Sequence, residues 1–306
     1  MKKILILSLT MCIFYLIKII YNKLDLETFT DPENSFNSEK YFDNEIFNKM
    51  NDNEKKQWTK KYYFHNIPVC ELCKSNTIRP ADKKIYCVWT GNNEMSNNRK
   101  EALELMKTNL GVDVVLITTK NLRLYIKKDY PLHDAYNYLS ETVKSDYLRC
   151  YLMHFYGGGY LDIKRTTEDY NKYFDNLNNS DKWINASPTP KGTYLGNNGN
   201  RTLSLSPLGA KFNICTTHFI CKSETPITHE WFLKLHQILD NKLELLKKNP
   251  SKDVRDETGK KLKDGTISKY PINWNELNAG ILGDIIWKYR DKVLLELPFP
   301  NFSNYI

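Results

Sequence analysis

Residues that could hold a charged ligand are concentrated in Ser145–Arg165, with the sequence SDYLRCYLMHFYGGGYLDIKR. Asp146 and Arg149 are three residues apart, so on a helix their side chains are neighbours that can form an ion pair. Asp162 is a further carboxylate near a glycine turn, and Lys164 follows it by two residues. Because glycine carries no side chain, another group can approach the backbone there closely. The combination suits a site for a charged ligand.

Local sequence patterns predict the elements that position these residues. An apolar residue recurs every four positions from Leu139 to Tyr151, which predicts a helix with one apolar face. This helix runs into Gly157–Gly159, where one glycine can adopt the left-handed conformation that ends a helix. The apolar run Tyr160–Ile163 is then typical of a strand, and Asp162 lies near its end.

A simpler interpretation carries about equal weight on these residues alone. The three glycines can form an ordinary helix-to-strand turn, and Asp146 with Arg149 can be a surface ion pair of little energetic consequence. Two nucleotide-binding motifs are excluded. The glycines follow a helix rather than a strand and lack the spacing of a dinucleotide-binding fingerprint, and no Gly-Lys-Ser/Thr phosphate loop occurs in the chain.

The arrangement Ser-Asp-x-x-Arg, followed after about eight residues by Gly-Gly-x-Tyr and x-Asp-x-Asp, resembles the sugar-nucleotide signature of glycosyltransferase family 32. It also resembles the related capsular-polysaccharide and mannosyltransferase-like proteins. The version here, GGGYLDIK, is similar to a viral and microbial branch, and the resemblance extends from about Lys84 to the C-terminus. One departure stands out, since Lys164 occupies the second acidic position of the family's Asp-x-Asp motif.

The resemblance implies an α/β, GT-A-like domain that moves a sugar from a nucleotide-sugar to a hydroxyl of a glycan or glycoconjugate, retaining the anomeric configuration. It places Mn²⁺ or Mg²⁺ on Asp162, where the metal would stabilise the departing diphosphate. It assigns catalysis to Asp162 and Lys164. The donor-binding residues that it implies are Asp146, Arg149, Trp89, Thr90, Gly91, Gly158, Gly159 and Tyr160.

Because Lys164 replaces an acid, three accounts are open of how positive charge is supplied to the departing diphosphate and of what Lys164 does. A metal ion can rest on Asp162 together with the diphosphate and another residue, and this account is preferred. Alternatively, Lys164 or Arg165 supplies the positive charge directly and little or no metal is needed. Thirdly, Asp162 and Lys164 share one face of a strand and can pair with each other. A catalytically weak sugar- or nucleotide-binding relative, with a recognition or assembly role, is the alternative function, and a purely structural membrane-anchored domain is a more remote one.

The segments around Lys84–Gly91 and Val112–Thr118 predict a mostly parallel sheet. Both are apolar strand candidates, and a helix over about Asn98–Thr108 separates them, as in a βαβ unit. Ligands of such sheets bind at the carboxyl ends of the strands. Trp89 lies at such an end and could stack on the donor, although a core tryptophan is at least as compatible with the sequence.

Four further elements are predicted towards the C-terminus. Thr225-Pro226 is a favourable helix start, because proline is well accommodated in the first turn. Asn273 followed by Glu276 resembles a capping box. The predicted elements are a strand over His218–Cys221, a helix from Pro226 to about Lys247, a helix from Asn273 to about Tyr289 and a last strand over Lys292–Leu297.

The chain of 306 residues has a formal net charge of +8, and this charge is unevenly distributed. Residues 1–54 hold more acids than lysines, so the remainder is the more basic part. A basic domain suits a nucleotide diphosphate or an acidic acceptor, but general lysine abundance explains the charge better. Lysines and aromatics do not interleave in a stripe, which speaks against a nucleic-acid partner.

The N-terminus predicts a membrane anchor. Residues 4–21 are almost wholly apolar, long enough to span a bilayer, and no small-residue cleavage site follows. We therefore expect a signal anchor over residues 1–21, a stem over 22–80 and the catalytic domain over 81–306. Known anchored glycosyltransferases favour a single-pass type II protein, with the catalytic domain in the lumen of a Golgi-like compartment or associated with a virus.

Cysteines and histidines offer no metal site by their spacing. The pair Cys70 and Cys73 lacks two further ligands at suitable distances, and His133 and His154 have no partners at ligand spacing and are expected to be structural. Cys150 could equally be a buried free thiol. An even number of cysteines outside the anchor permits disulfides in a lumenal domain, these being Cys70, Cys73, Cys87, Cys150, Cys215 and Cys221.

Overall fold

The computed structural model describes residues 78–188 and 214–299. The predicted anchor and most of the predicted stem, including Cys70 and Cys73, lie outside these ranges. Among the residues described, no helix is long and apolar enough to cross a membrane.

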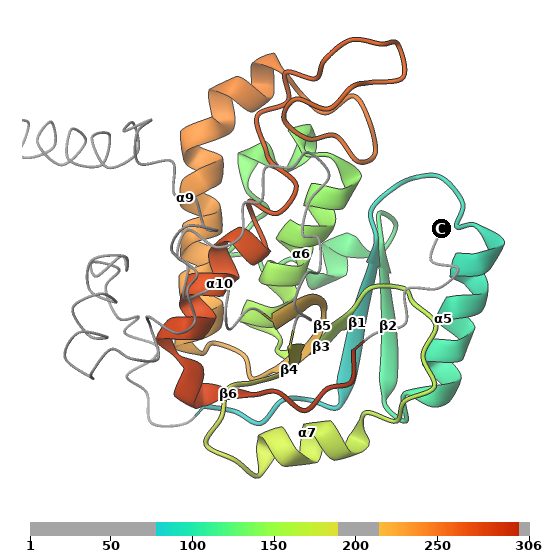
Figure 1. Ribbon diagram of the computed structural model, residues 1–306, viewed down its shortest axis with the longest axis vertical. Coiled ribbons are helices and arrows are strands. Elements are labelled where there is room, and N and C mark those ends of the chain that lie inside the picture. The colour runs from blue at the N-terminus through green and yellow to red at the C-terminus, as the bar shows by residue number, and fades with distance from the viewer. Residues whose placement is uncertain (1–77, 189–213, 300–306) are drawn as a thin grey trace, which may run out of the picture. The chain divides into compact units, whose positions relative to one another are not determined.

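The described part of the chain folds around a six-stranded sheet with the order β2-β1-β3-β5-β4-β6 (Figure 1). β5 runs antiparallel to both of its neighbours, whereas the other strand pairs of this sheet are parallel. The fold is therefore mixed α/β with a mostly parallel sheet, as predicted. The strands are β1 (Lys84–Trp89), β2 (Asp113–Thr118), β3 (Gly158–Leu161), β4 (Ile184–Pro188), β5 (Ile214–Cys221) and β6 (Val293–Leu294).

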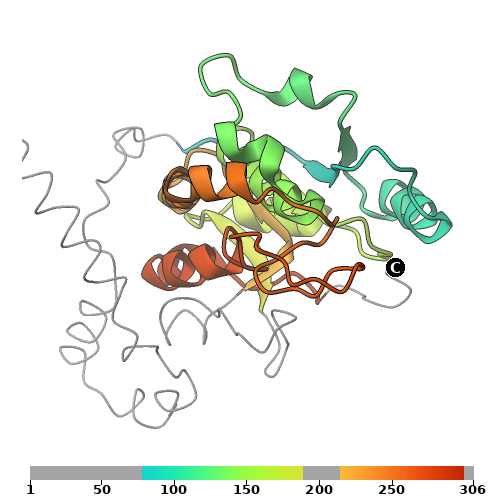
Figure 2. The same ribbon diagram turned by 90° about the horizontal axis from the view of Figure 1, so that it is seen from above.

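Helices cover both faces of the sheet because successive strand side chains point to opposite sides. Tyr86 and Val88 of β1 belong to the core with α6, α9 and α10, whereas Ile85 and Cys87 pack with α5 and α7 on the other face. Figure 2 views these layers from above. The helices are α5 (Asn97–Asn109), α6 (Glu141–Phe155), α7 (Asn171–Asn178), α9 (Pro226–Lys248) and α10 (Ala279–Lys288), with 3₁₀ turns η3 (Leu122–Tyr125), η4 (Asp134–Tyr138) and η5 (Arg290–Lys292).

The βαβ unit predicted near the start of the domain is confirmed. β1 and β2 pair in parallel along their whole length, from Lys84 opposite Asp113 to Trp89 opposite Thr118. α5 connects them and buries Ala102, Leu103 and Met106 against the sheet. α9 is confirmed as well, since Thr225 caps its N-terminus and Pro226 occupies the first turn.

The predicted glycine end of the central helix α6 is confirmed, but the helix begins at Glu141, after Leu139, with which the apolar repeat starts. The Ser140 side chain caps it by accepting a hydrogen bond from the backbone N–H of Val143. At the other end Gly157 has a φ of +63°, and its N–H donates to the carbonyl of Leu152 at 3.2 Å. The left-handed glycine lets the chain reverse into β3 at once.

The next two glycines belong to β3 itself, so the strand begins before the predicted Tyr160. A Cβ on Gly158 would lie 2.7 Å from the carbonyl oxygen of Lys84, and a Cβ on Gly159 would lie 2.4 Å from Cδ1 of Ile85. These glycines allow β3 to pack closely against β1. They lie at the amino end of β3, whereas Asp162 follows its carboxyl end, so their position does not favour the predicted donor contact.

The predicted start of the last helix is wrong. The Glu276 side chain accepts a hydrogen bond from the Asn273 N–H at 2.9 Å, as a capping box requires, but the residues up to Asn278 form turns and α10 begins only at Ala279. Asn278 has φ −127° and ψ −101°, outside the helical region. The final strand is also shorter than predicted, because β6 pairs with β4 over only two residues, from Val293 to Leu294.

The four cysteines in the described ranges are free and buried: Cys87, Cys150, Cys215 and Cys221. A disulfide among these four is therefore excluded in this fold. Burial raises the pKa of the Cys87 thiol to about 12 and that of Cys150 well above its usual value, so both stay protonated at neutral pH.

Histidines are concentrated where α6 packs against α9. His154 and His236 flank Phe232, with ring centroids 5.0 and 4.2 Å from it, and His229 lies 5.5 Å from His154. Burial, with smaller contributions from neighbouring His229, His236 and Lys127, lowers the pKa of His154 to about 3. His133 has a structural role, because its side chain accepts the Ala135 N–H.

Acid should destabilise the fold through this helix interface. A histidine with a lowered folded-state pKa binds its proton more readily in the unfolded chain, so stability is lost as the pH falls below about 6.5. For His154 we expect the free energy of unfolding to fall by about 2 kcal/mol between pH 7 and pH 5. Urea unfolding between pH 7 and pH 5 measures this loss of stability. In His154→Gln the free energy of unfolding should depend less steeply on pH. An unchanged slope in that variant would contradict the assignment.

Candidate functional site

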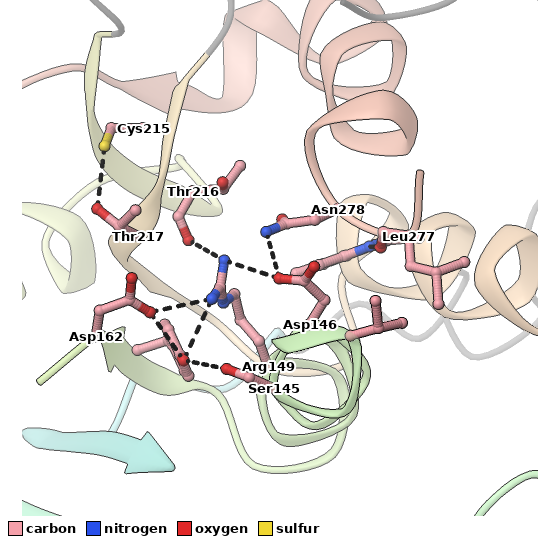
Figure 3. Close-up of polar contacts among 12 residues, drawn as sticks. Ser145, Asp146, Arg149, Asp162, Cys215, Thr216, Thr217, Leu277 and Asn278 are labelled. Atoms are coloured by element: carbon pink, nitrogen blue, oxygen red, sulfur yellow. Dashed lines mark hydrogen bonds and ion pairs between the residues drawn. The ribbon is translucent and has the colours of Figure 1, made fainter. Parts of the chain in front are cut away.

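A buried polar network lies at the carboxyl end of β3, with the Arg149 guanidinium at its centre (Figure 3). Arg149 comes from α6 and is only 5% exposed. Its Nη1 lies 3.4 Å from Asp146 Oδ1 and donates to the backbone carbonyl of Thr216 at 2.7 Å. Its Nη2 donates to Asp162 Oδ1 at 3.1 Å. One guanidinium thus joins α6, β5 and the residue that follows β3.

Tyr160 of β3 also holds Arg149 and Asp162 in place. The guanidinium lies over its ring, 4.2 Å from the centroid, and its hydroxyl donates to Asp162 Oδ1 at 3.0 Å. The Ser145 hydroxyl is 3.0 Å from the Tyr160 oxygen. Burial raises the pKa of Tyr160 above its usual value, so it remains a hydrogen-bond donor at neutral pH. One oxygen of Asp162 is therefore held by two donors, from Tyr160 and Arg149.

The Asp146 oxygen that faces Arg149 also contacts Asn278, which sequence analysis did not identify. The Asn278 Nδ2 donates to Asp146 Oδ1 at 2.8 Å across 132 residues of sequence. Burial raises the pKa of Asp146 to about 6, although Arg149 and the Asn278 hydrogen bond oppose the shift. The Asn278 Oδ1 is buried and has no hydrogen-bond partner among the residues that the structure describes. No local sequence signal marks Asn278, because its partner is so distant in the chain.

Lys164 is almost completely enclosed, with 2% of the residue exposed. Its Nζ lies 3.4 Å from Asp162 Oδ2, so the predicted pairing of these two residues is confirmed. Burial lowers the pKa of Lys164, while Asp162 raises it by stabilising the ammonium form. Asp162 is thus flanked by a cation at each carboxylate oxygen, Arg149 at one and Lys164 at the other.

The described residues do not fit a Mn²⁺ or Mg²⁺ site centred on Asp162. Both carboxylate oxygens already face nitrogen cations, and an ammonium group at 3.4 Å would repel a dication. Across residues 78–188 and 214–299, no group of three or more His, Cys, Asp and Glu side chains could hold a metal ion. Mg²⁺ prefers several oxygen ligands, and Asp162 offers one crowded carboxylate.

The residues after β1 lie at the same edge of the sheet but outside this network. The Thr90 hydroxyl donates to the carbonyl of Glu141 at 2.8 Å, which ties this loop to the first turn of α6. Trp89 is partly exposed, packs on the α5 side of the sheet and donates from its indole to the carbonyl of Asn93 at 2.8 Å. A Cβ on Gly91 would lie 2.3 Å from the Asn93 side chain. Donor contacts of Trp89, Thr90 and Gly91 remain predictions.

Two further contacts that the sequence did not reveal support the network. Arg99 of α5 donates from Nη1 to the carbonyl of Ile163 at 2.6 Å, which holds the backbone between Asp162 and Lys164. The Thr216 carbonyl is available because β5 runs antiparallel to β3, which places the first half of β5 beside the carboxyl end of β3. Of the predicted site residues, the structure brings together Asp146, Arg149, Tyr160, Asp162 and Lys164.

Part of the sequence matches a protein-family model. Residues 34–176 match the family model described as capsular polysaccharide synthesis protein, and this range contains α6, β3 and the residues up to Lys164 but neither Thr216 nor Asn278. No curated protein matches the chain. Among solved structures, the protein described as PaToxG Glycosyltransferase is similar at 14% identity, over 69% of this chain and 70% of that one, with a TM-score of 0.37. A TM-score this low does not establish a shared fold.

Removing the Arg149 guanidinium should reveal its structural role. Arg149→Met leaves the buried carboxylates of Asp146 and Asp162 without their main cation, so we expect the free energy of unfolding to fall by about 3–5 kcal/mol at pH 7.5. The loss should be smaller at pH 5, because Asp146 then becomes protonated. Urea unfolding of Arg165→Met is the matched control. Arg165 pairs with Glu101 on the surface, and its removal should change little. An equal loss in both variants would contradict the assignment.

Proposed function

We propose that this protein is a glycosyltransferase that moves a sugar from a nucleotide-sugar donor to a hydroxyl of a glycan or glycoconjugate. The observation that carries the proposal is that Asp146, Arg149, Tyr160 and Asp162, the residues of the family 32-like signature, converge in one buried network at the carboxyl end of β3. The family-model match to capsular polysaccharide synthesis proteins covers all four. A GT-A-like arrangement and retention of configuration belong to the same proposal.

In this proposal the network positions Asp162 and two cations around the donor diphosphate. Tyr160 and Arg149 hold one oxygen of Asp162, and the other oxygen faces Lys164. As the sugar–phosphate bond breaks, negative charge accumulates on the leaving diphosphate. Fixed cations in a site largely screened from water can stabilise that charge without reorganising.

Lys164 supplies, in this proposal, the positive charge that a metal ion supplies in relatives with two acids. Two features support this role over the metal account that the family resemblance favours. The Lys164 ammonium stands 3.4 Å from the carboxylate that would ligate the metal, and both oxygens of Asp162 are engaged by cations. Asp162 in turn favours the charged form of Lys164, against the effect of burial. Mn²⁺ or Mg²⁺ bound through the diphosphate is the competing account.

The proposal includes the predicted location. The apolar residues 4–21 would hold the protein as a single-pass type II membrane protein, with the catalytic domain lumenal or virus-associated. The donor would then be drawn from the compartment that contains the domain. An acceptor on a membrane-bound glycoconjugate would be reached without release of the enzyme.

A second candidate function is sugar or nucleotide binding without efficient transfer. The specific observation in its favour is that cations face both oxygens of Asp162, so this carboxylate is poorly placed to bind a metal ion. Hydrolysis of the donor separates the two functions. The full-length protein would be screened against a panel of nucleotide-sugars, and release of the nucleotide diphosphate would be measured. A binding protein would retain donors without cleaving them.

Asp162 is the first residue to test. Asp162→Asn keeps the shape of the side chain but removes the charge that orients Lys164 and Arg149. We expect transfer or donor hydrolysis to fall by about 10²-fold or more, which is the usual effect of removing one charge-stabilising group. Asp175→Asn is the matched control, since Asp175 pairs with Lys83 at the surface of α7. Rates close to wild type in Asp162→Asn would contradict the site assignment.

Lys164 distinguishes the two accounts of the diphosphate charge. If lysine supplies it, EDTA should barely affect the wild type and Lys164→Asp should lose at least about 10²-fold in activity, because a fixed cation becomes an anion. Lys164→Arg keeps the charge and tests whether folding alone explains the loss. An EDTA-sensitive wild type together with an active Lys164→Asp variant would show that a metal ion carries the charge instead.

A further inference from the structure

Residues 251–269, which we term the basic loop, lie between α9 and Tyr270 and carry a concentration of cations. Three of the loop's four acids are buried or paired, whereas the fourth, Asp264, is exposed and accepts hydrogen bonds from Thr266. Asp256 and Glu257 are buried, and Asp253 pairs with Lys260 at 2.6 Å. The exposed cations, none of which forms an ion pair with the described residues, are Lys252, Arg255, Lys261, Lys263 and Lys269.

The basic loop has a defined structure. The backbone N–H and hydroxyl of Thr142 both donate to the Val254 carbonyl, at 3.2 and 2.9 Å, and the Ser140 hydroxyl donates to the Asp256 carbonyl at 3.3 Å. Farther along, Lys261 and Ile267 form an antiparallel bridge. These contacts fix the loop against the N-terminal end of α6, above the sheet in Figure 1.

This fixed backbone holds two branched aliphatic side chains outward. Val254 is 59% exposed and Ile267 is 61% exposed, whereas Leu262 between them in sequence is buried. Residues directly opposite in an antiparallel pair present their side chains on the same face, so the Ile267 side chain lies beside that of Lys261. The loop therefore exposes apolar and cationic groups together.

We propose that the basic loop docks this end of the domain on an anionic lipid surface. Clustered lysines and arginines are attracted to acidic headgroups, and exposed aliphatic side chains gain by entering the headgroup boundary. An acidic glycan would satisfy the cations but not Val254 and Ile267. Residues 251–269 themselves contain no aromatic side chain on which a sugar ring could stack.

The position of the basic loop relates docking to the candidate site. The loop is bonded to Ser140 and Thr142 at the start of α6, and the same helix carries Asp146 and Arg149. Lipid binding by the loop does not require the proposed transfer reaction. If both hold, docking would bring the network to the surface from which a lipid-linked acceptor is presented.

Hydrogen exchange measured by mass spectrometry tests the docking. The full-length protein would be mixed with nanodiscs of phosphatidylcholine alone or of phosphatidylcholine with phosphatidylserine. Because only the headgroup charge differs, the comparison holds with or without an N-terminal anchor. We expect slower exchange across residues 251–269 in the anionic discs only, and loss of this protection at high salt.

Charge reversal provides the matched comparison. Lys261→Glu with Lys263→Glu should weaken binding to anionic discs by about fivefold or more per residue, whereas Lys107→Glu with Lys172→Glu, on α5 and α7, should leave it unchanged. Ile267→Ser should weaken binding without altering its salt dependence. Thermal unfolding checks that each variant is folded.

Equal exchange in both kinds of disc would overturn the proposal. So would protection by a soluble polyanion such as heparin with none by anionic lipid, which would show that the surface binds a glycan-like polyanion. Donor hydrolysis in the same variants keeps this result separate from the proposed function, since docking can fail while hydrolysis persists.

Discussion

The burial of one guanidinium dominates the architecture of the candidate site. A charged group that leaves water must be met by hydrogen-bond acceptors and opposite charge, or its burial is prohibitively costly. Arg149 finds them on three separate parts of the chain: Asp146 on its own helix, Tyr160 and Asp162 at the end of β3, and the Thr216 carbonyl on β5. The buried charge of Arg149 therefore depends on contacts from all three parts of the chain.

The reversed direction of β5 brings Thr216 to Arg149. β5 runs antiparallel to β3, so its first residues, rather than its last, lie beside the carboxyl end of β3. A backbone carbonyl of Thr216 then reaches Arg149 without adding a further charge to the network. The same logic extends to Asn278, whose amide satisfies Asp146 without neutralising it. Because the Thr216 carbonyl and the Asn278 amide are uncharged, they bond the network without weakening the attraction of Arg149 and Lys164 for Asp162.

The parts of the fold that depend on neighbours in sequence could be predicted, and those that depend on distant partners could not. Periodicity and capping identified β1, α5, β2, α6 and α9 because those signals are local. The start of α10 was missed because a local capping bond at Asn273 competes with the distant bond from Asn278 to Asp146. For Gly158 and Gly159, the sequence shows that close approach to the backbone is allowed but not that β1 is what packs there.

The structure also separates two populations of lysine and arginine that composition treats as one. Arg149 and Lys164 are buried, and each is held by a carboxylate at the network. In the basic loop three of the four acids are buried or paired and only Asp264 is exposed, so the exposed cations outnumber the exposed acids and form no ion pairs in the described chain. Net charge alone is consistent with simple lysine abundance. The location of the acids distinguishes the two populations. Carboxylates contact the buried cations of the network, whereas most of the acids in the basic loop are buried or paired with Lys260 and leave its exposed cations in excess.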